Sequence, residues 1–591
     1  MSTNLSKQKR EDLLNKIEEI RKYLKTNLYD ENARKLTGYL GELTAQINGQ
    51  KYGLVFEEHC EKIDETLENH LPVLTEEKEL FVGNGGEMNF LIEGDNLASL
   101  QLLEKTHKGK IDVIYIDPPY NTGNKDFIYD DDFVDSADSF RHSKWLSFME
   151  KRLRIARELL SEKGVIFISI DDNEQADLKL LCDEIFGLEK FASMFPWRKR
   201  TAKSDVPFGI SQDYEWILCY ANCNFVASIE GKERKYFETE DFPNKPWRFH
   251  DMSTQRKAEE RPNSDFTMIN PKNGKEYPVN KMAVWRITKN DFQKYYNEGR
   301  IIFPGDYDFL KISKPVLRYW KEDDIKKAGA NFGRIAVSTK FPDTVGMSQD
   351  GTKEITEILK EKAFLYPKSL ELIKFLLQLS TFNSPFSTVL DFFAGSGTTG
   401  HAVLKLNAED GGHRKFILCT NNENGICRDI TYERLKTVIT GERKDGSKYS
   451  DGLSGSLKYF KVDFVEITEK EYYEYADKLL LHVRELVELE NAVDFEHNKA
   501  VAIVLTEEEL EEFMQSLAST PLASTPLAST PLSNRVETED SEQSRTAVSE
   551  RSRTVYLGHD VLLSKAQKVL FEQNGISVKI IPQYYYPELN G

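Results

Sequence analysis

The stretch "DVIYIDPPYNTG", residues 112–123, places Asp117, Pro118, Pro119 and Tyr120 directly after a run of apolar residues. The prolines fix the backbone and leave their carbonyl oxygens free to accept hydrogen bonds, the carboxylate is a further acceptor, and the tyrosine offers a flat face. Together these features predict a binding position for an exocyclic amino group on a planar base. An ordinary Asp-Pro-Pro turn is the alternative interpretation of the same residues.

The N6 amine of adenine would suit this position. Its lone pair is delocalised into the ring, and two acceptors that engage its hydrogens would localise that lone pair toward a methyl donor. A base stacked inside a duplex cannot reach such a position, so it would have to be flipped out, at a cost of a few kcal/mol. Stacking of the flipped base on Tyr120 would offset roughly 1–3 kcal/mol of that cost.

A second stretch, "TVLDFFAGSGTTGHAV" at residues 388–403, is predicted to form a strand, a glycine-bearing turn and a helix that begins near Thr398. Gly395, Gly397 and Gly400 match the spacing of dinucleotide-binding loops. Glycines allow the backbone to approach a ligand closely. We therefore expect a nucleotide-binding loop here, with a tight turn that binds nothing as the alternative.

The identity of the expected nucleotide depends on Asp391. A negative charge at this position would repel a phosphate but would hold an ammonium group. This favours S-adenosylmethionine, a nucleotide that carries an amino acid, over NAD. Phe392 or Phe393 could stack on its adenine, and Glu423, after the next strand, could accept hydrogen bonds from its ribose hydroxyls.

Both stretches need a sheet that brings the carboxyl ends of their strands to one edge. Short apolar strands alternate with amphipathic helices over residues 90–170, and the same pattern resumes near residue 385. This alternation predicts an α/β fold with a Rossmann-like, doubly wound parallel sheet. The long basic and aromatic stretch between the two halves is most simply explained as an inserted domain.

The charge distribution points to a nucleic-acid partner although the net charge of the chain is −18. Residues 196–321 hold 23 Lys and Arg against 17 Asp and Glu, a local net charge of +6. Here "PWRKR", "KPWRFH" and "VWRITKNDFQKYYNEGR" interleave basic and aromatic residues, as a DNA-binding surface would. A solvated surface with its aromatic residues in the core is an equally good interpretation. The candidate DNA contacts are Asn121, Arg198, Lys199, Arg200, Arg248, Arg256 and Arg286.

The chain is expected to be cytoplasmic. Its first residues, "MSTNLSKQKR", lack the apolar core of a signal peptide, and no run of about 18 apolar residues would span a membrane. The six cysteines are scattered along the chain, which favours reduced thiols over metal ligands.

Several motifs resemble those of the modification (Mod) subunits of type III restriction-modification systems, which are permuted, β-class DNA amino-methyltransferases. In that family the catalytic "DPPY" precedes the "FAGSG" cofactor loop, and a target-recognition domain lies between them. The resemblance implies a circularly permuted methyltransferase sheet. The motifs that carry it are "KYGLVFEEH" (51–59), "FLIEGDNLASLQLL" (90–103), "DPPYNTG", "YPKSLELI" (366–373), "DFFAGSGTTGHAV" and "ENGICRDITYERLK" (423–436).

The resemblance assigns roles to individual residues. Asp117 and Tyr120 would be the catalytic and base-stacking residues, and Pro118 would supply a carbonyl oxygen. Asp95 would contact the adenine of S-adenosylmethionine, and Lys368 would lie near its methionine end. The remaining cofactor contacts would come from Asp391, Phe392, Phe393, Ala394, Gly395, Ser396, Gly397, Thr398 and Glu423.

The resemblance also implies partners: double-stranded DNA, a Mod homodimer, and a separate Res translocase-nuclease subunit docked through the N- and C-terminal regions. No helicase or nuclease motif is visible, so we expect no DNA cleavage by this chain alone. The expected organisation is an N-terminal helical region (1–85), a catalytic half (86–195), a target-recognition domain (196–355), a cofactor-binding half (356–440) and a C-terminal α/β region (441–591). That last region contains a flexible loop, 517–553, around three copies of "LASTP".

Other functions remain open at this stage. The Asp of "DPPY" resembles adenine-modifying enzymes, since cytosine-N4 enzymes more often have Ser there, but a cytosine-N4 or RNA amino-methyltransferase is an alternative. An NAD-dependent oxidoreductase would use the glycine loop but leave "DPPY" unexplained. A non-catalytic DNA-binding scaffold is the remaining alternative. The chain departs from the family at its "LASTP" repeat and at "CTNNE" before Glu423.

Overall fold

The computed structural model of the protein describes two units. The first comprises residues 1–225, 339–377 and 384–591, and the second comprises residues 226–338 and 378–383. The residues described are 5–25, 36, 39–41, 43–44, 56–123, 127–129, 132–134, 138–201, 209–231, 234–329, 332–381, 386–467, 479–498, 500–519, 554–558 and 561–581. Most of "KYGLVFEEH" and the expected flexible loop from residue 520 onward lie outside these residues.

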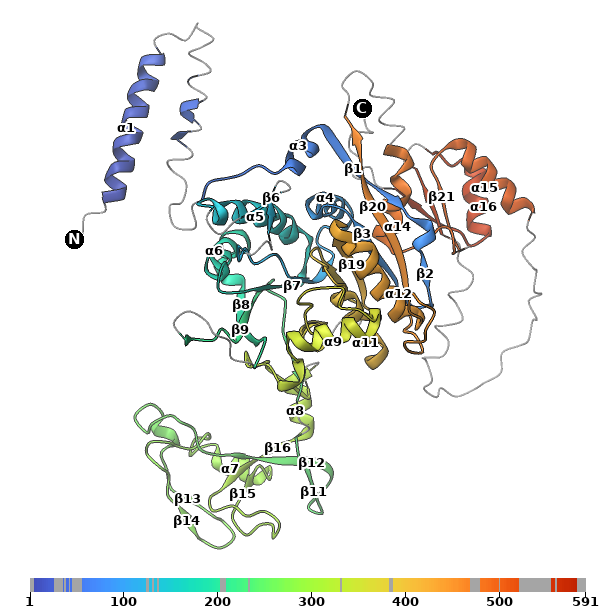
Figure 1. Ribbon diagram of the computed structural model, residues 1–591. Helices are drawn as coiled ribbons and strands as arrows, with labels where there is room; N and C mark the ends of the chain where they lie inside the picture. Colours follow the sequence, from blue (N-terminus) through green and yellow to red (C-terminus); the bar gives the residue numbers. More distant parts are fainter. Residues whose placement is uncertain are drawn as a thin grey trace. The chain divides into compact units, whose positions relative to one another are not determined.

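A mixed sheet of ten strands forms the centre of the first unit (Figure 1). The strands from β20 to β7 run parallel, whereas β1, β9 and β8 are antiparallel to their neighbours. The order across the sheet is β1 (His70–Glu76), β20 (Ser456–Glu466), β3 (Met88–Glu93), β19 (Lys415–Thr420), β18 (Thr388–Asp391), β4 (Ile111–Ile116), β7 (Leu160–Ile170), β9 (Tyr214–Ala221) and β8 (Phe191–Arg198), with β2 (Val82–Gly83) paired to β20.

The chain leaves two neighbouring strands of this sheet in opposite directions. β18 and β4 are paired through Val389 with Val113 and Leu390 with Ile114. From β18 the chain continues to β19 and β20 on one side, and from β4 it continues to β7 on the other. A crevice for ligands opens where such connections diverge, at the carboxyl ends of the strands. Both predicted chemical stretches begin at this point.

Helices cover both faces of the sheet because the two sets of connections run in opposite directions and parallel crossovers are right-handed. α4 (Asn96–His107), α5 (Arg141–Leu159), α6 (Gln175–Phe186) and α14 (Val483–Asn491) contribute to one large apolar core. α11 (Thr398–Asp410) and α12 (Glu433–Thr440) belong to the opposite connections, and α9 (Ser348–Leu359) packs on α12. The doubly wound α/β arrangement predicted from the sequence is confirmed.

The sheet extends beyond the ranges expected for it. β1 lies in the segment expected to be helical, and β20 lies in the expected C-terminal region. They pair antiparallel from His70 with Glu466 to Glu76 with Phe460, so two segments nearly 400 positions apart close this edge of the sheet. The N-terminal segment also holds the expected helical structure, in α1 (Leu5–Lys25) and α3 (Lys62–Asn69).

A small parallel sheet lies in the C-terminal part of the first unit. Its strands are β21 (Val501–Val504), β22 (Thr554–Leu557) and β23 (Ser577–Ile580), in that order. Helices α15 (Glu507–Ser519) and α16 (Lys565–Gln573) contribute Leu510 and Phe571 to its core. The first unit also contains β5 (Ile128–Tyr129), β6 (Asp132–Phe133) and most of α10 (Leu370–Thr381).

The second unit is built on a four-stranded antiparallel sheet. Its order is β11 (Phe237–Thr239), β12 (Phe242–Asp251), β16 (Val316–Trp320) and β15 (Ile301–Ile302). The other elements are β10 (Ile229–Glu230), β17 (Arg334–Ile335), β13 (Met268–Ile269), β14 (Glu276–Tyr277), α7 (Phe292–Asn297) and α8 (Lys321–Ala328). It occupies a narrower range than the domain expected over residues 196–355.

The tryptophans of this unit lie in its two apolar cores. Trp247, Trp285 and Trp320 are at most 3% exposed. The Arg318 guanidinium is also buried and lies 4.5 Å from the ring centroid of Trp247 and 4.3 Å from that of Phe242. For these residues the structure therefore supports the second interpretation of the aromatic pattern, in which the rings lie in the core.

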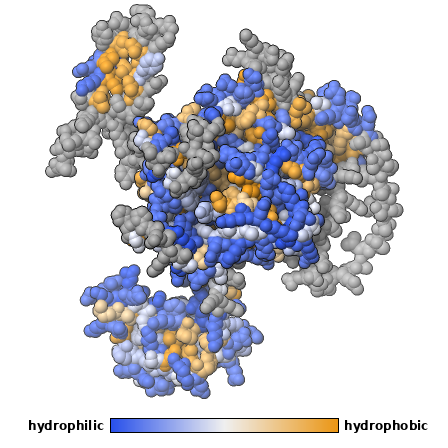
Figure 2. Space-filling view, in the orientation of Figure 1, coloured by the Kyte–Doolittle hydropathy of each residue, from blue (hydrophilic) through white to orange (hydrophobic). Residues whose placement is uncertain are grey.

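All six cysteines are free. Within the described part of the chain, no helix is long and apolar enough to cross a membrane. In the view of Figure 2 hydrophilic residues dominate the surface, and apolar residues gather in separate patches.

A buried ion cluster joins β20 to the edge of the sheet. The Lys458 side chain is fully buried, and its Nζ lies 3.1 Å from Glu76, 2.7 Å from Glu488 and 3.2 Å from Asp494. Substitution Lys458→Met should lower the free energy of unfolding by about 3–5 kcal/mol, because it leaves buried carboxylates without their cation. Urea denaturation measures this.

The matched control is Lys461→Met, on the same strand but partly exposed. It should leave the urea midpoint almost unchanged. Equal midpoints for the two variants would contradict the buried cluster.

Candidate functional site

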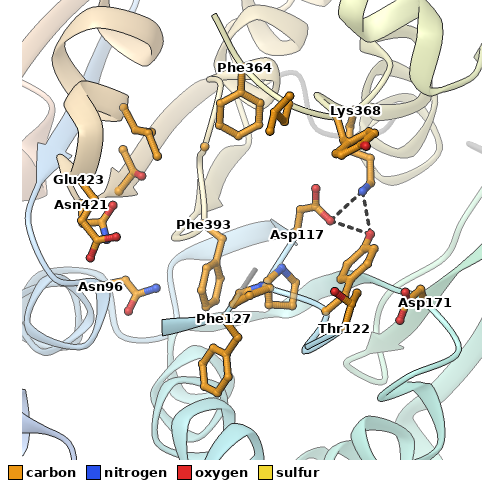
Figure 3. Close-up of a pocket in the computed structure, with 18 of the residues that line it drawn as sticks. Asn96, Asp117, Thr122, Phe127, Asp171, Phe364, Lys368, Phe393, Asn421 and Glu423 are labelled. Atoms are coloured by element: carbon orange, nitrogen blue, oxygen red, sulfur yellow. Dashed lines mark hydrogen bonds and ion pairs between the residues drawn. The ribbon is translucent and has the colours of Figure 1, made fainter. Parts of the chain in front are cut away.

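A cavity of about 1250 Å³ lies in the first unit, at the carboxyl ends of β4 and β18 (Figure 3). Its walls come from the segments that follow five parallel strands: 95–96 after β3, 117–122 after β4, 171 after β7, 392–395 after β18 and 420–426 after β19. The segment 364–368, which leads into α10, Lys199 and Arg200 after β8, and Glu215 of β9 also line it. Residues of the predicted catalytic turn and cofactor loop therefore line the crevice that the sheet topology predicts.

Figure 3 shows polar side chains on either side of Phe393. On one side are the amides of Asn96 and Asn421 and the carboxylate of Glu423. On the other side are Asp117 and Lys368, which a dashed line joins. The cavity thus has two chemically different ends that share one aromatic ring.

Asp117 and Tyr120 belong to a network of four ionisable side chains. The Tyr120 hydroxyl lies 2.8 Å from Asp117 Oδ1 and 3.2 Å from Glu215 Oε2. The Lys368 ammonium donates to the Tyr120 hydroxyl at 2.7 Å and lies 2.9 Å from Asp117 Oδ1 and 3.4 Å from Glu215 Oε2. On the far side of Glu215, Lys199 Nζ contacts Oε1 at 3.2 Å.

Burial and charge act against each other in this network. Burial raises the pKa of the Asp117 carboxyl, although Lys368 counteracts it. Burial would lower the pKa of Lys368, but Asp117 and Glu215 together hold it above the ordinary value. Burial would raise the pKa of Glu215, yet Lys368 and Lys199 keep it below the ordinary value. Lys368 and Glu215 therefore stay charged near neutral pH. The hydroxyl of Tyr120 stays protonated, because burial and the adjacent carboxylates raise its pKa well above 10.0.

The two prolines are not equivalent. The indole Nε1 of Trp145, which is fully buried on α5, donates to the Pro119 carbonyl at 2.7 Å. No hydrogen bond among the described residues engages the carbonyl of Pro118, and both prolines line the cavity. Likewise, the contacts of Asp117 involve Oδ1, and its Oδ2 bonds to none of the described residues. Two residues that line the cavity thus each have one oxygen, the Pro118 carbonyl and Asp117 Oδ2, without a hydrogen-bond partner among the described residues.

The glycine loop is shaped by close packing. Gly395 and Gly397 have φ of +50° and +74°, a region that side chains disfavour. At Gly400, on α11, a Cβ would lie 2.9 Å from Leu435 and 3.0 Å from Leu418. The third glycine therefore allows the helix to approach its neighbours closely, and only Gly395 of the three lines the cavity.

The orientation of Asp391 corrects the expectation that it holds the ammonium group of a cofactor. Its side chain is 2% exposed and does not line the cavity. One oxygen accepts from the Phe393 amide at 3.0 Å and the other from the Thr399 hydroxyl at 2.6 Å. Burial raises the pKa of Asp391 to about 7. The carboxylate therefore stabilises the loop through these two hydrogen bonds, on the side away from the cavity.

The other cofactor candidates divide between the wall and the interior. Asp95, Lys368, Phe392, Phe393, Gly395 and Glu423 line the cavity, whereas Ala394, Ser396, Gly397 and Thr398 do not. The buried guanidinium of Arg434 holds the loop from below, since it donates to the Thr398 hydroxyl at 2.7 Å and to the Ser396 carbonyl at 3.3 Å. The loop thus presents its first residues to a ligand and packs its last ones against α12.

Several residues of the site were not predicted from the sequence. Asn96 directly follows the predicted Asp95, and Asn421 lies two positions before the predicted Glu423. Phe364 precedes the "YPKSLELI" motif. Glu215 lies in "DYEWILCY", on an antiparallel strand within the basic stretch, and no spacing or motif marks it. Only the pairing of β9 with β7 brings it to Tyr120.

Asn121 was expected to contact DNA, and the structure corrects this expectation. Its side chain is fully buried, and its backbone has φ of +56°. The Nδ2 group donates to Glu174 Oε1 at 2.5 Å and to the Arg141 carbonyl at 3.2 Å. Asn121 therefore holds the turn that ends "DPPY" in place.

The basic candidates of the first unit lie at or beside the cavity. Arg198 is exposed at the end of β8, and Lys199 and Arg200 line the cavity wall. The Lys199 ammonium is paired with Glu215. Contacts of these side chains with DNA remain predictions.

The basic candidates of the second unit differ in availability. Arg248 makes two hydrogen bonds to Asp324 of α8, at 2.6 and 2.9 Å, which fix its guanidinium, and its contact with DNA stays a prediction. Arg256 is paired with Glu260 but is largely exposed. Arg286 lines a second cavity, of about 750 Å³, within this unit. Arg256 and Arg286 remain candidates for DNA contacts.

Comparison with known proteins gives one family and several relatives. The N6/N4 methyltransferase family model, described as DNA methylase, matches residues 111–433. The StyLTI Mod subunit of a type III restriction-modification enzyme, from Salmonella typhimurium, is 33% identical over 60% of this chain and 56% of its own length. The EcoPI Mod subunit of Escherichia phage P1 is 33% identical over 58% of each chain. The type II methyltransferase M.KpnI of Klebsiella pneumoniae is 32% identical over 63% of this chain and 90% of its own length.

The structural role of Asn121 can be tested by two substitutions at one position. Asn121→Ala should lower the free energy of unfolding by about 2–3 kcal/mol, because it removes a buried hydrogen bond and strains the backbone. Asn121→Gly removes the same bond without the strain and should be about 1 kcal/mol more stable than the Ala variant. Urea denaturation measures both. If Asn121 served only to contact DNA, both variants would be as stable as the wild type.

Proposed function

The chain belongs to the N6/N4 DNA methylase family, and on that premise we propose that it transfers a methyl group from S-adenosylmethionine to the N6 amine of adenine in double-stranded DNA. The observation that carries the proposal is the pair of available acceptors, Asp117 Oδ2 and the Pro118 carbonyl, at the wall of a cavity with a second polar end. The StyLTI and EcoPI relatives support a role as the modification and specificity subunit of a type III system. The chain spans little more than half the length of either relative.

The Asp117 end of the cavity has what an adenine N6 amine requires. An amino group offers two hydrogens, and Asp117 and Pro118 offer two acceptors. Binding both hydrogens disfavours conjugation of the lone pair with the ring and directs it toward an electrophile. The ring of Tyr120 gives the base a face to stack on, and its hydroxyl is anchored by Asp117 and Lys368. The main contributions of the protein are to orient the amine and to stabilise the positive charge that develops on it.

The opposite end of the cavity fits S-adenosylmethionine. Glu423 would accept from the ribose hydroxyls, and the Phe393 ring would pack against the adenine. Asn96, Asn421 and Asp95 offer further polar contacts, and the cavity has room for a nucleotide and a base together. When bound, this cofactor supplies an electrophilic methyl group on sulfur. Asp391, Ser396 and Thr398 would act indirectly, by keeping the loop in shape.

The target adenine would have to leave the DNA duplex to reach Asp117. Unstacking costs a few kcal/mol, and stacking on Tyr120 offsets part of it. Arg198, Lys199 and Arg200 at the cavity, with Arg256 and Arg286 of the second unit, would contact the DNA. The proposal includes a homodimer, a Res subunit that supplies translocation and cleavage, and a cytoplasmic location.

Modification-sensitive sequencing of DNA from cells that express the chain tests this function. The wild type should place N6-methyladenine at one short motif, and Asp117→Ala should abolish it, because the amine loses one of its acceptors. Modification of one strand only would support the type III assignment. Unchanged S-adenosylmethionine binding by the purified variant serves as the control for folding.

Other outcomes would redirect the proposal. N4-methylcytosine at a defined motif would replace adenine by cytosine as the target. The absence of any modified base, from soluble wild-type protein that binds the cofactor, would contradict a DNA substrate for the chain alone.

A further inference from the structure

The hydroxyl of Tyr120 has one proton and two carboxylate acceptors. Asp117 Oδ1 lies 2.8 Å from it and Glu215 Oε2 lies 3.2 Å from it. Because Lys368 donates to the same hydroxyl oxygen at 2.7 Å, the tyrosine must act as acceptor toward the lysine and as donor toward a carboxylate. A hydroxyl donates only one hydrogen bond, so it satisfies Asp117 or Glu215 but not both at once.

Glu215 is well placed to take over this bond. It is 8% exposed, and it reaches the network from β9, a strand that contributes no other residue to the cavity wall. Lys199 holds its other oxygen at 3.2 Å, which fixes the carboxylate without using Oε2. Lys368 lies between Glu215 and Asp117, within 3.4 Å of both. The two carboxylates therefore share one ammonium and compete for one hydroxyl proton.

We propose that Glu215 is a positioning residue that frees Asp117 for its substrate: when the amine binds Asp117, the Tyr120 hydroxyl transfers its hydrogen bond to Glu215. This inference rests on the proposed methyltransferase function. In the free protein Tyr120 and Lys368 both engage Asp117, which weakens it as an acceptor. Glu215 offers the Tyr120 hydroxyl and the Lys368 ammonium another acceptor, so Asp117 can accept a stronger hydrogen bond from the amine. No proton leaves any residue in this exchange.

The exchange also explains why a buried lysine lies beside a residue that must accept a hydrogen bond. With Asp117 as its only partner, Lys368 would neutralise that carboxylate. With two carboxylates, its charge is shared, and the Tyr120 ring is held by its hydroxyl whichever acceptor is in use. The titratable groups around Glu215 are Asp117, Tyr120, Lys199, Lys368 and, through longer-range charge effects, Tyr115 and Asp171.

The test uses Glu215→Leu, which removes the acceptor, and Glu215→Gln, which keeps an oxygen acceptor but no charge. Single-turnover methylation by the full-length protein should fall about tenfold or more in the Leu variant, equivalent to one lost hydrogen bond, and less in the Gln variant. The affinities for S-adenosylmethionine and DNA should change less than the rate, because Glu215 touches neither in this proposal.

A double-substitution cycle identifies the path of the effect. Tyr120→Phe lacks the hydroxyl, so adding Glu215→Leu to it should cost much less than Glu215→Leu costs in the wild type. Asp213→Asn, two residues away on the same segment and bonded to Ser211, is the matched control and should methylate at the wild-type rate. Fully additive losses would overturn the proposal.

The dependence of the rate on pH gives a readout that a purely structural role would not change. Glu215 is a like charge that raises the pKa of Asp117, so its removal should lower that pKa. The acid limb of the rate profile should then move to lower pH in Glu215→Gln while the plateau falls. A wild type that does not methylate would refute the proposed function. A methylating wild type with an unaltered Glu215→Gln profile would refute this inference alone.

Discussion

The parallel pairing of β18 with β4 is the constraint on which the site depends. These strands are separated by some 270 positions in the chain, and each delivers one of the two chemical stretches to the same sheet edge. The register is reinforced by Asp112, whose carboxylate accepts from the Thr388 amide at 3.0 Å. A slip by one residue would turn every side chain to the other face and would separate the catalytic turn from the glycine loop. The catalytic turn and the glycine loop therefore meet only in this alignment.

Charge balance inside the cavity is the second organising feature. Asp117, Lys368, Glu215 and Lys199 alternate in sign in this order, and each lies within hydrogen-bond or ion-pair distance of the next. Buried charges persist only when they are paired in this way. The same arrangement recurs at Lys458 and beneath the glycine loop, where Arg434 contacts Glu354 at 2.9 Å. The protein thus keeps several charged groups out of solvent by grouping them.

The second unit shows how a sequence pattern can have two causes. Its Arg and Trp residues alternate as they would on a nucleic-acid surface, but Trp247 and Trp320 surround the buried Arg318 instead. Cation–π contacts of this kind hold a guanidinium inside an apolar core. The DNA contacts expected of this unit therefore depend on its remaining charged residues, including Arg256 and Arg286, and not on these aromatic rings.

The sequence by itself determined what depends on consecutive residues. "DPPY" after an apolar strand and "FAGSG" before a helix indicated an amine-binding turn and a cofactor loop, and the strand–helix alternation indicated the doubly wound sheet. Tertiary structure alone decided which way side chains point and which distant segments meet. It buried Asn121 and Asp391, left Pro118 rather than Pro119 with an available carbonyl, and placed β1 and β20 in the sheet. It also brought Glu215 to Tyr120. These outcomes depend on contacts between residues far apart in the chain, and neither composition nor spacing records such contacts.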